Sequence, residues 1–207
     1  ADEIVDTFHD YDKAKLLDEF EKNYRDALEN GISLNPILHS FCTTQREKNI
    51  PQHLVDAFLH SMRMDLGDIK DLNDEKYNEY IYGSAEVVGL MCLKVFVDGN
   101  EEEYQKLKPF AQSLGAAFQK INFLRDISAD YTDLGRTYFP NVNFRNFSQQ
   151  DKLEIEKDIA KDFEHSLIGI KMLPMSSRLA VFMAYKYYTN LFKKIKKCKP
   201  EILMHKR

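Results

Sequence analysis

Residues 115–130 read GAAFQKINFLRDISAD, and this stretch combines an apolar helical pattern with a row of polar side chains. Gln119, Asn122, Asp126 and Asp130 recur at intervals of three and four residues, which puts them on one face of a helix. Apolar residues flank this face on both sides, as in a helix that packs into a core. A purely structural core helix does not need four polar side chains on one stripe. We therefore expect an all-helical protein in which this face binds a polar ligand.

A second pair of aspartates at the same spacing stands at the beginning of the sequence. Asp2 and Asp6, like Asp126 and Asp130, are four residues apart, so each pair presents two carboxylates on one helix face. Like charges at this spacing repel, whereas a magnesium ion takes oxygen ligands and keeps substrate phosphates in its shell. Two such helices facing each other would clamp a metal-bridged diphosphate. Two further pairs are interpreted as solvated helix faces: Asp6/Asp10 and Asp158/Asp162.

The remaining sequence also predicts helices, separated by capping and breaking residues. Gly and Pro are scarce and no stretch alternates with a period of two, so no strand is expected. Helices are expected over residues 2–9, 12–30, 74–97 and 100–129, and beginning at residues 36, 51, 148 and 174. Pro109 is expected to kink or split its helix, and residues 131–147 form the one long irregular segment. The pattern predicts a single all-α bundle over residues 1–207.

Composition excludes several classes of protein. A net charge of −4 argues against a general nucleic-acid binder, and no apolar run is long enough to span a membrane. The three cysteines lack a C-x-x-C spacing, and the acidic beginning is no secretory signal, so we expect reduced thiols in a cytoplasmic protein. The lysines at positions 193–199 oppose a helix dipole; the alternative is a peripheral contact with a membrane surface.

Small residues cluster in a second unusual stretch, residues 80–91, which read YIYGSAEVVGLM. Glycine inside a helix costs up to about 1 kcal/mol, so Gly83, Ala85 and Gly89 indicate either close helix packing or room for a long apolar ligand. Glu86 in their midst is expected to face a polar partner.

Together these segments resemble the squalene/phytoene synthase family, the head-to-head prenyl synthases. Residues 2–6 resemble its first aspartate-rich motif, SAEVVG at 84–89 its Val-Ala-Gly-x-Val-Gly stretch, and residues 119–130 its Gln-x-x-Asn-x-x-x-Asp-x-x-x-Asp signature. Residues 136–140, RTYFP, are similar to its Arg-x-Tyr-Leu-Pro, and Tyr188 resembles a tyrosine of its last long helix. Five segments in the family's order run through almost the whole chain.

The resemblance implies a helical bundle of the isoprenoid synthase type with a central apolar cavity. It implies magnesium ligands at Asp2, Asp6, Asn122 and Asp126. It implies contacts with substrate or diphosphate at Gln119, Arg125, Arg136, Tyr138, Tyr188, Ala85 and Gly89. It implies catalytic roles for Tyr80, Tyr82, Asp126 and Asp130.

The implied activity joins two prenyl diphosphates of C15 or C20 length, with magnesium and through a cyclopropylcarbinyl diphosphate; NADPH is needed only if squalene forms. One alternative is a noncatalytic relative that acts as an assembly or binding protein, although the intact aspartates disfavour it. Head-to-tail synthases and terpene cyclases use Asp-Asp-x-x-Asp, and no Asp-Asp pair occurs in this chain.

The sequence departs from the family pattern at two places. Ser84-Ala85-Glu86 replaces Val-Ala-Gly, which brings an acid into the cavity stretch. The sequence also begins at the first aspartate motif, where family members have further helices. We therefore expect the chain to be N-terminally incomplete and, by itself, a poor catalyst.

Overall fold

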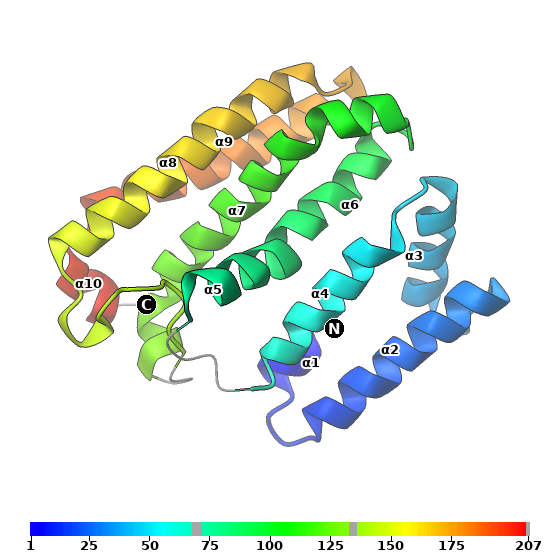
Figure 1. The fold of residues 1–207 in the computed structure, drawn as a ribbon, viewed down its shortest axis with the longest axis horizontal. Coiled ribbons are helices and arrows are strands. Elements are labelled where there is room, and N and C mark those ends of the chain that lie inside the picture. Colours follow the sequence, from blue (N-terminus) through cyan, green and yellow to red (C-terminus); the bar gives the residue numbers. More distant parts are fainter. Residues whose placement is uncertain (68–71, 133–135, 206–207) are drawn as a thin grey trace.

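The computed structural model describes residues 1–67, 72–132 and 136–205, and every regular element in these ranges is a helix. The elements are α1 (Asp2–Thr7), α2 (Lys13–Asn30), α3 (Pro36–Glu47), α4 (Gln52–Met64), α5 (Asp74–Ile81), the π-helical turn η1 (Tyr82–Glu86), α6 (Val87–Phe96), α7 (Glu101–Thr132), the 3-10 turn η2 (Phe144–Asn146), α8 (Gln149–Met172), α9 (Met175–Lys197) and α10 (Pro200–His205). The predicted all-α class is confirmed (Figure 1).

Most helix boundaries fall where the capping residues predict them. Asp12 caps α2 by accepting a hydrogen bond from the Lys15 amide, and Gly31 ends the same helix in the left-handed region at a φ of 77°. Asn35 accepts from two amides at the start of α3, and Ser148 forms a full capping box at the start of α8. Local side-chain chemistry therefore determines where these helices begin and end.

Two helices differ from the expected form. The predicted helix 74–97 is continuous but contains the π-helical turn η1 at Tyr82–Glu86, a feature that occurs mostly at functional sites. Pro109 does not split its helix, because α7 runs unbroken from Glu101 to Thr132. The ribbon of α7 bends within its N-terminal third (Figure 1), so the expected kink is present and the expected split is not.

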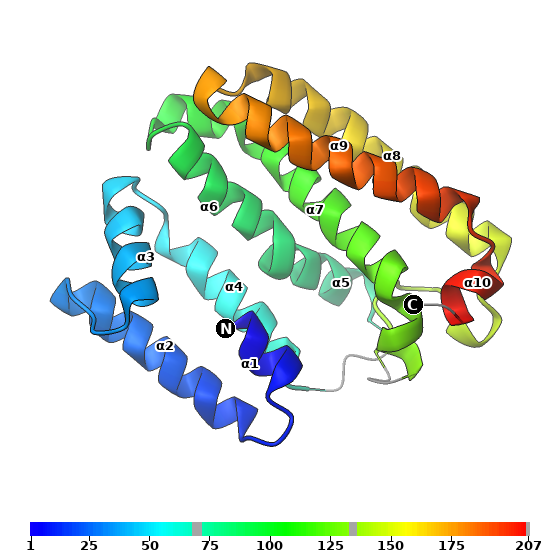
Figure 2. The same ribbon diagram turned by 180° about the vertical axis from the view of Figure 1, so that it is seen from behind.

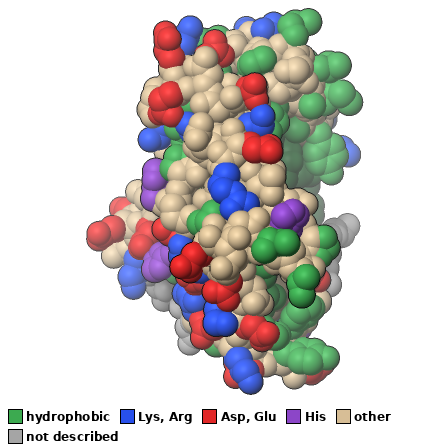
Figure 3. All heavy atoms as spheres, turned by 90° about the vertical axis from the view of Figure 1, so that its right-hand side faces the viewer, with side chains coloured by type: hydrophobic (Ala, Val, Ile, Leu, Met, Phe, Trp, Pro, Cys, Tyr) green, Lys and Arg blue, Asp and Glu red, His purple; other side chains and the backbone are tan. Residues whose placement is uncertain are grey.

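The long helix α7 lies at the centre of the bundle, between α6 and α8 (Figures 1 and 2). The largest buried apolar cluster joins α5, α7 and α8 through residues such as Tyr80, Ile121, Leu124 and Ile159. Helix α9 covers α7 from the side seen in Figure 2 and exposes Met175, which is 80% accessible. Figure 3 shows hydrophobic side chains gathered along one edge of the molecule. None of the helices in the described part of the chain is long and apolar enough to cross a membrane.

The interpretation of Asp158/Asp162 as a solvated face holds for Asp158, whose side chain is 56% exposed, and is wrong for Asp162, whose side chain is 20% exposed. Helix α8 packs along α7, and both carboxylates pair with the buried Lys120 of α7. The Lys120 ammonium donates hydrogen bonds to both carboxylates, with an Nζ–Oδ2 distance of 2.7 Å for Asp162. A buried charge needs such partners, and the two aspartates therefore have a structural role between α7 and α8.

Candidate active site

The polar face of α7 leads from the interior of the bundle to the end of the helix. At its inner end, Gln119 Nε2 lies 3.4 Å from Ser84 Oγ of η1, and its Oε1 lies 3.5 Å from Asn122 Nδ2. The Tyr188 hydroxyl of α9 lies 3.4 Å from Asn122 Oδ1. Asp126 and Asp130 continue the row toward the C-terminal end of α7. The structure thus joins residues of η1, α7 and α9 in one polar row.

Arg136 connects the end of this row to α1, the helix that carries the first aspartate pair. The Arg136 amide donates to the Asp130 carbonyl at 2.8 Å, which fixes its backbone to α7. Its guanidinium lies 3.8 Å from Asp6 Oδ1 and donates to the Asp65 carbonyl at 2.8 Å. Arg136 therefore lies next to one residue of each aspartate pair, Asp6 through its side chain and Asp130 through its backbone.

Asp65 is a site residue that the sequence analysis missed. It caps the C-terminal end of α4, and its side chain is 5% exposed. Its Oδ1 accepts a hydrogen bond from the Tyr80 hydroxyl at 2.7 Å and lies 3.9 Å from Arg136 Nη1. No periodic pattern marks this position in the sequence, because a single carboxylate after a helix is also an ordinary turn residue.

Three carboxylates of this region have a raised pKa, namely Asp2, Asp65 and Asp130, and burial is the largest cause for Asp2 as well. Burial, followed by the charge of Asp126, raises the pKa of Asp130 to about 6 against the lowering influence of Arg136. Burial, with the charges of Asp6 and Asp2, raises the pKa of Asp65 to about 6. The Tyr80 hydrogen bond and Arg136 oppose that second shift. Burial is therefore the main cause of both shifts, and neighbouring negative charges add to it.

The donor set fits a magnesium–diphosphate cluster in its chemistry, since it consists of carboxylate and amide oxygens. In the described ranges, no three Asp, Glu, His or Cys side chains converge closely enough to hold a metal ion alone. Asp126 receives two hydrogen bonds from its neighbour Arg125, at 2.9 and 2.6 Å. Phosphate oxygens would complete the shell between the two aspartate helices, so the residues fit a metal that binds together with diphosphate.

Aromatic rings form a wall beside Arg136. Tyr138 stacks on Phe123 with centroids 4.0 Å apart, and the Tyr80 ring lies 5.4 Å from that of Tyr138. Burial raises the pKa of both tyrosines well above the usual value for a phenol, so both phenols stay neutral. Neutral aromatic faces attract a cation without attacking it.

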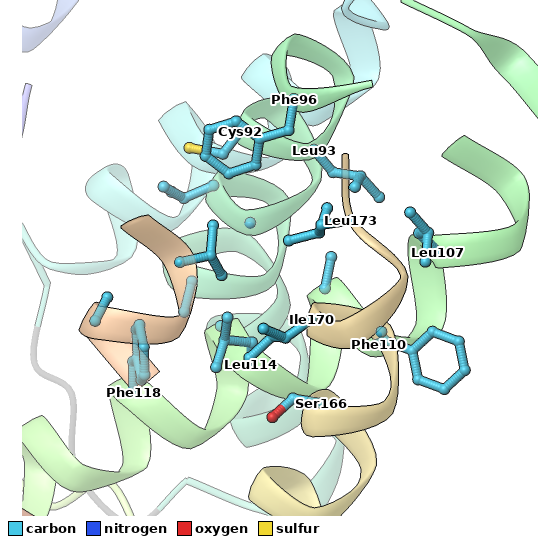
Figure 4. A pocket seen from close by; sticks show the side chains of 18 of the residues that line it. Cys92, Leu93, Phe96, Leu107, Phe110, Leu114, Phe118, Ser166, Ile170 and Leu173 are labelled. Atoms are coloured by element: carbon cyan, nitrogen blue, oxygen red, sulfur yellow. The ribbon is translucent and has the colours of Figure 1, made fainter. Parts of the chain in front are cut away.

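An apolar cavity of about 370 Å³ lies between α6, α7, α8 and α9 and reaches Ser84 and Gln119 at the polar row. Figure 4 shows apolar side chains of its lining, among them Leu93, Leu114 and Ile170, which come from three helices. The volume is in the range of pockets that enclose small molecules, about 300–1,000 Å³. The expected central apolar cavity is present, and it opens onto the polar row.

Both interpretations of the small residues hold, close packing and space for a ligand. Ala85 and Gly89 line the cavity. Gly83 packs against α4, where a Cβ would lie 2.6 Å from the Ala57 carbonyl oxygen. Gly115 of α7 is equally tight, because a Cβ there would lie 2.6 Å from the Ala85 carbonyl oxygen. Gly89 has both roles, because it lines the cavity and a Cβ there would lie 2.9 Å from the Ala111 carbonyl oxygen of α7.

Two residues of the second stretch lie away from the carboxylates. Tyr82 packs into a separate apolar cluster around Leu54 and Val87, so it is not brought together with Tyr80 and Tyr138. Glu86 has the expected polar partner, since Gln112 Nε2 donates to its Oε2 at 2.7 Å. Burial raises the pKa of Glu86, and this hydrogen bond opposes the shift.

Comparisons with known proteins point to one family. A model of the family described as squalene/phytoene synthase matches residues 1–207. A 4,4'-diapophytoene synthase from Staphylococcus haemolyticus (strain JCSC1435) is 32% identical over 84 residues, which are 41% of this chain and 28% of that protein's length. The aligned region thus spans less than a third of this curated relative.

Two solved structures share the fold. The squalene synthase HpnC from Alicyclobacillus acidocaldarius superposes with a TM-score of 0.80 at 18% identity, over 95% of this chain and 78% of the other. A dehydrosqualene synthase in complex with a ligand gives 0.76 at 20% identity, over 94% and 81%. At this identity the likeness concerns the fold, and it confirms the expected bundle of the isoprenoid synthase type.

Proposed function

Because the chain belongs to the squalene/phytoene synthase family, we propose that it takes part in the magnesium-dependent, head-to-head condensation of two prenyl diphosphates. The observation that carries this proposal is the continuous polar row of α7. It begins at Gln119 in the lining of an apolar cavity and ends at Asp130, opposite Asp6. An amphiphilic substrate matches this order, with its chain in the cavity and its diphosphate among the charged groups.

The proposed metal ligands are Asp2 and Asp6 of α1 and Asn122 and Asp126 of α7, with Asp130 in support. Bound magnesium would stabilise the negative charge that develops on the departing diphosphate. Arg125 and Arg136 would contact diphosphate oxygens, since a guanidinium binds phosphate through paired hydrogen bonds. Arg136 is 12% exposed and already held in place, so little side-chain entropy remains to be lost on binding.

The proposed reaction forms a carbon–carbon bond between the two chains. Diphosphate leaves one substrate, the resulting allylic cation alkylates the second, and loss of a proton gives a cyclopropylcarbinyl diphosphate. Loss of the second diphosphate then allows rearrangement. The neutral rings of Tyr80, Phe123 and Tyr138 suit the neighbourhood of a carbocation, because their π faces attract it and no phenolate is present to trap it.

The substrates are proposed to be C15 or C20 diphosphates, with NADPH as reductant only if the product is squalene. Gln119, Tyr188, Ala85 and Gly89 are proposed to contact the substrate near the junction of cavity and polar row, where Tyr188 stacks on Phe118 at 3.8 Å. We place the reaction in the cytoplasm, at or near a membrane surface that takes up the apolar product.

The test is incubation of the full-length protein with C15 and C20 diphosphates and magnesium, with and without NADPH, followed by mass spectrometry. We expect a C30 or C40 hydrocarbon and release of two diphosphates for each product. Both should disappear when magnesium is chelated. Tight binding of the substrates without any product or diphosphate release would support the noncatalytic alternative instead.

A further inference from the structure

Helix α9 carries a stripe of apolar side chains on the side that faces away from the bundle. The stripe consists of Met175, Leu179, Met183 and Tyr187, which are four residues apart and so share one side of the helix. Their exposed fractions are 64–80%, whereas Ile195 on the opposite side of α9 is buried. The helix lies on the face of the bundle that Figure 2 turns toward the viewer. A contiguous row of large exposed apolar side chains marks an interaction surface.

The charged residues of this part of the chain all have the same sign. No aspartate or glutamate occurs between Glu164 and Glu201, and the same stretch contains eight lysines and arginines in a chain whose net charge is −4. Lys193, Lys194 and Lys197 are exposed at the end of α9. The helix dipole favours lysines in the last turn, but it does not explain the lack of acids along the whole helix. Exposed apolar side chains accompanied only by basic ones are typical of a helix that lies in the interface of an anionic membrane.

The apolar surface of α9 continues into the cavity. Val181 and Ala184 of α9 line the cavity, and both are within one turn of Met183. Val88 of α6 also lines the cavity and is 38% exposed, so the lining reaches the surface. Under the proposed function, the cavity holds a prenyl chain and the product is a hydrocarbon that has lost both diphosphates. A lipid surface against α9 would therefore offer this product an apolar environment next to the cavity.

We propose that the outer face of α9 docks on the surface of an anionic lipid bilayer, with the apolar stripe among the headgroups and the lysines against the lipid phosphates. This inference rests on the proposed function for the apolar product, but the docking itself can be measured without turnover. Each lysine close to an anionic membrane raises the affinity by roughly fivefold. A second copy of the chain is disfavoured as the occupant, because it would bring the basic residues of two α9 helices together.

The experiment is co-sedimentation of the full-length protein with lipid vesicles in the absence of substrate. Neutral vesicles contain phosphatidylcholine alone, and anionic vesicles contain phosphatidylcholine mixed with phosphatidylglycerol. The wild type should bind the anionic vesicles at least about tenfold more tightly than the neutral ones. High salt should remove most of this difference, because it screens the attraction between lysines and lipid phosphates.

Two double variants test the two parts of the surface. Leu179→Ser with Met183→Ser should lower the affinity for both kinds of vesicle at least about tenfold, because it removes apolar side chains from the membrane interface. Lys193→Gln with Lys194→Gln should lower the affinity for anionic vesicles at least about tenfold and leave that for neutral vesicles unchanged. All four side chains are exposed, so both variants should keep the melting temperature of the wild type.

The controls change the same kinds of side chain at and near α2, on the side of the molecule away from α9 (Figures 1 and 2). Lys15→Gln with Lys22→Gln removes two exposed lysines of α2. Ile32→Ser with Leu34→Ser removes two apolar side chains that are 66% and 102% exposed. Both controls should bind anionic vesicles as tightly as the wild type.

The results separate this inference from the proposed function. If the full-length wild type does not bind anionic vesicles, or if the test and control variants lose equal affinity, the inference is overturned, whereas product formation still decides the proposed function. A dimer in sedimentation velocity that Leu179→Ser with Met183→Ser dissociates, without vesicle binding by the wild type, would assign the surface to a second copy. Vesicle binding that depends on α9, by a protein that forms no product, would support the docking surface and contradict the proposed function.

Discussion

Asp130→Asn should stabilise the metal-free protein at pH 7 while lowering the proposed turnover. The pKa of Asp130 rises from a usual 3.8 to about 6 because of burial and the neighbouring Asp126. Each pKa unit corresponds to about 1.4 kcal/mol, so the ionised carboxylate costs the folded state roughly 3 kcal/mol. This shift already includes the attraction of Arg136, and solvent still reaches part of the carboxylate and weakens the effect, so we expect a net gain of about 1–3 kcal/mol. In a chain of this length that raises the melting temperature by about 2–10 °C.

The sign of the pH dependence follows from the two states of the chain. The folded state holds the Asp130 proton up to a pKa of about 6, whereas the unfolded chain releases it near 3.8. The folded state therefore binds more protons between these values, and its free energy of unfolding falls as the pH rises through this window. Below pH 4 the wild type and Asp130→Asn should be equally stable, and above pH 6 their difference should be complete.

The measurement is urea denaturation between pH 4 and pH 8 in the presence of a metal chelator. The control is Asp56→Asn, because Asp56 is a half-exposed aspartate of α4 whose partner, Arg25, lies on the surface at 2.7 Å. It should change the free energy of unfolding by less than about 1 kcal/mol. If Asp130→Asn were less stable than the wild type at pH 7, with no convergence toward pH 4, the charge of Asp130 would not be strained and the reasoning would be wrong.

Three further predictions concern the metal, the cavity and the packing. Asp126→Asn should abolish magnesium-dependent turnover and leave the circular dichroism spectrum unchanged, whereas the control Asp56→Asn should retain full turnover. Turnover by Asp126→Asn would show that Asp126 is not a metal ligand. Ala85→Phe should narrow the cavity and shift product formation toward shorter prenyl substrates in competition assays, with little change in melting temperature. A large drop in melting temperature with an unchanged substrate preference would instead show that Ala85 serves helix packing. Gly115→Ala should lower the free energy of unfolding by about 1–3 kcal/mol in urea titrations, because its Cβ would lie 2.6 Å from a backbone oxygen. Gly67→Ala, where the nearest atom is at 3.5 Å, should be nearly neutral, and an equal loss in both would contradict the packing argument.

Most of the fold follows from interactions between residues close in sequence. The caps at Asp12, Asn35 and Ser148 and the helical period of the apolar residues predict most helix boundaries and the all-α class. The same period predicts the polar face of α7, because residues three and four apart share a helix face in any structure. Pro109 was expected to kink or split its helix; α7 bends but stays continuous (Figure 1), and it packs along its length against α6 and α8.

Contacts between residues far apart in the chain could not be predicted from the sequence. Lys120 and Asp162 are 42 residues apart, and only the packing of α8 along α7 brings them together in a partly buried ion pair. The π-helical turn η1 could not be predicted either, because no residue of Tyr82–Glu86 distinguishes it from an ordinary helix in the sequence.

The sequence by itself determined the helical class, the two aspartate pairs and the polar face of α7, because each depends on spacing within one helix. Only the tertiary structure decided that Asp65 belongs to the site and that Arg136 lies between the aspartate helices. These two residues are 71 positions apart, and their contact exists because the ends of α4 and α7 and the helix α1 meet at one place in the bundle. A periodic pattern specifies which side chains share a face, whereas packing specifies what that face meets.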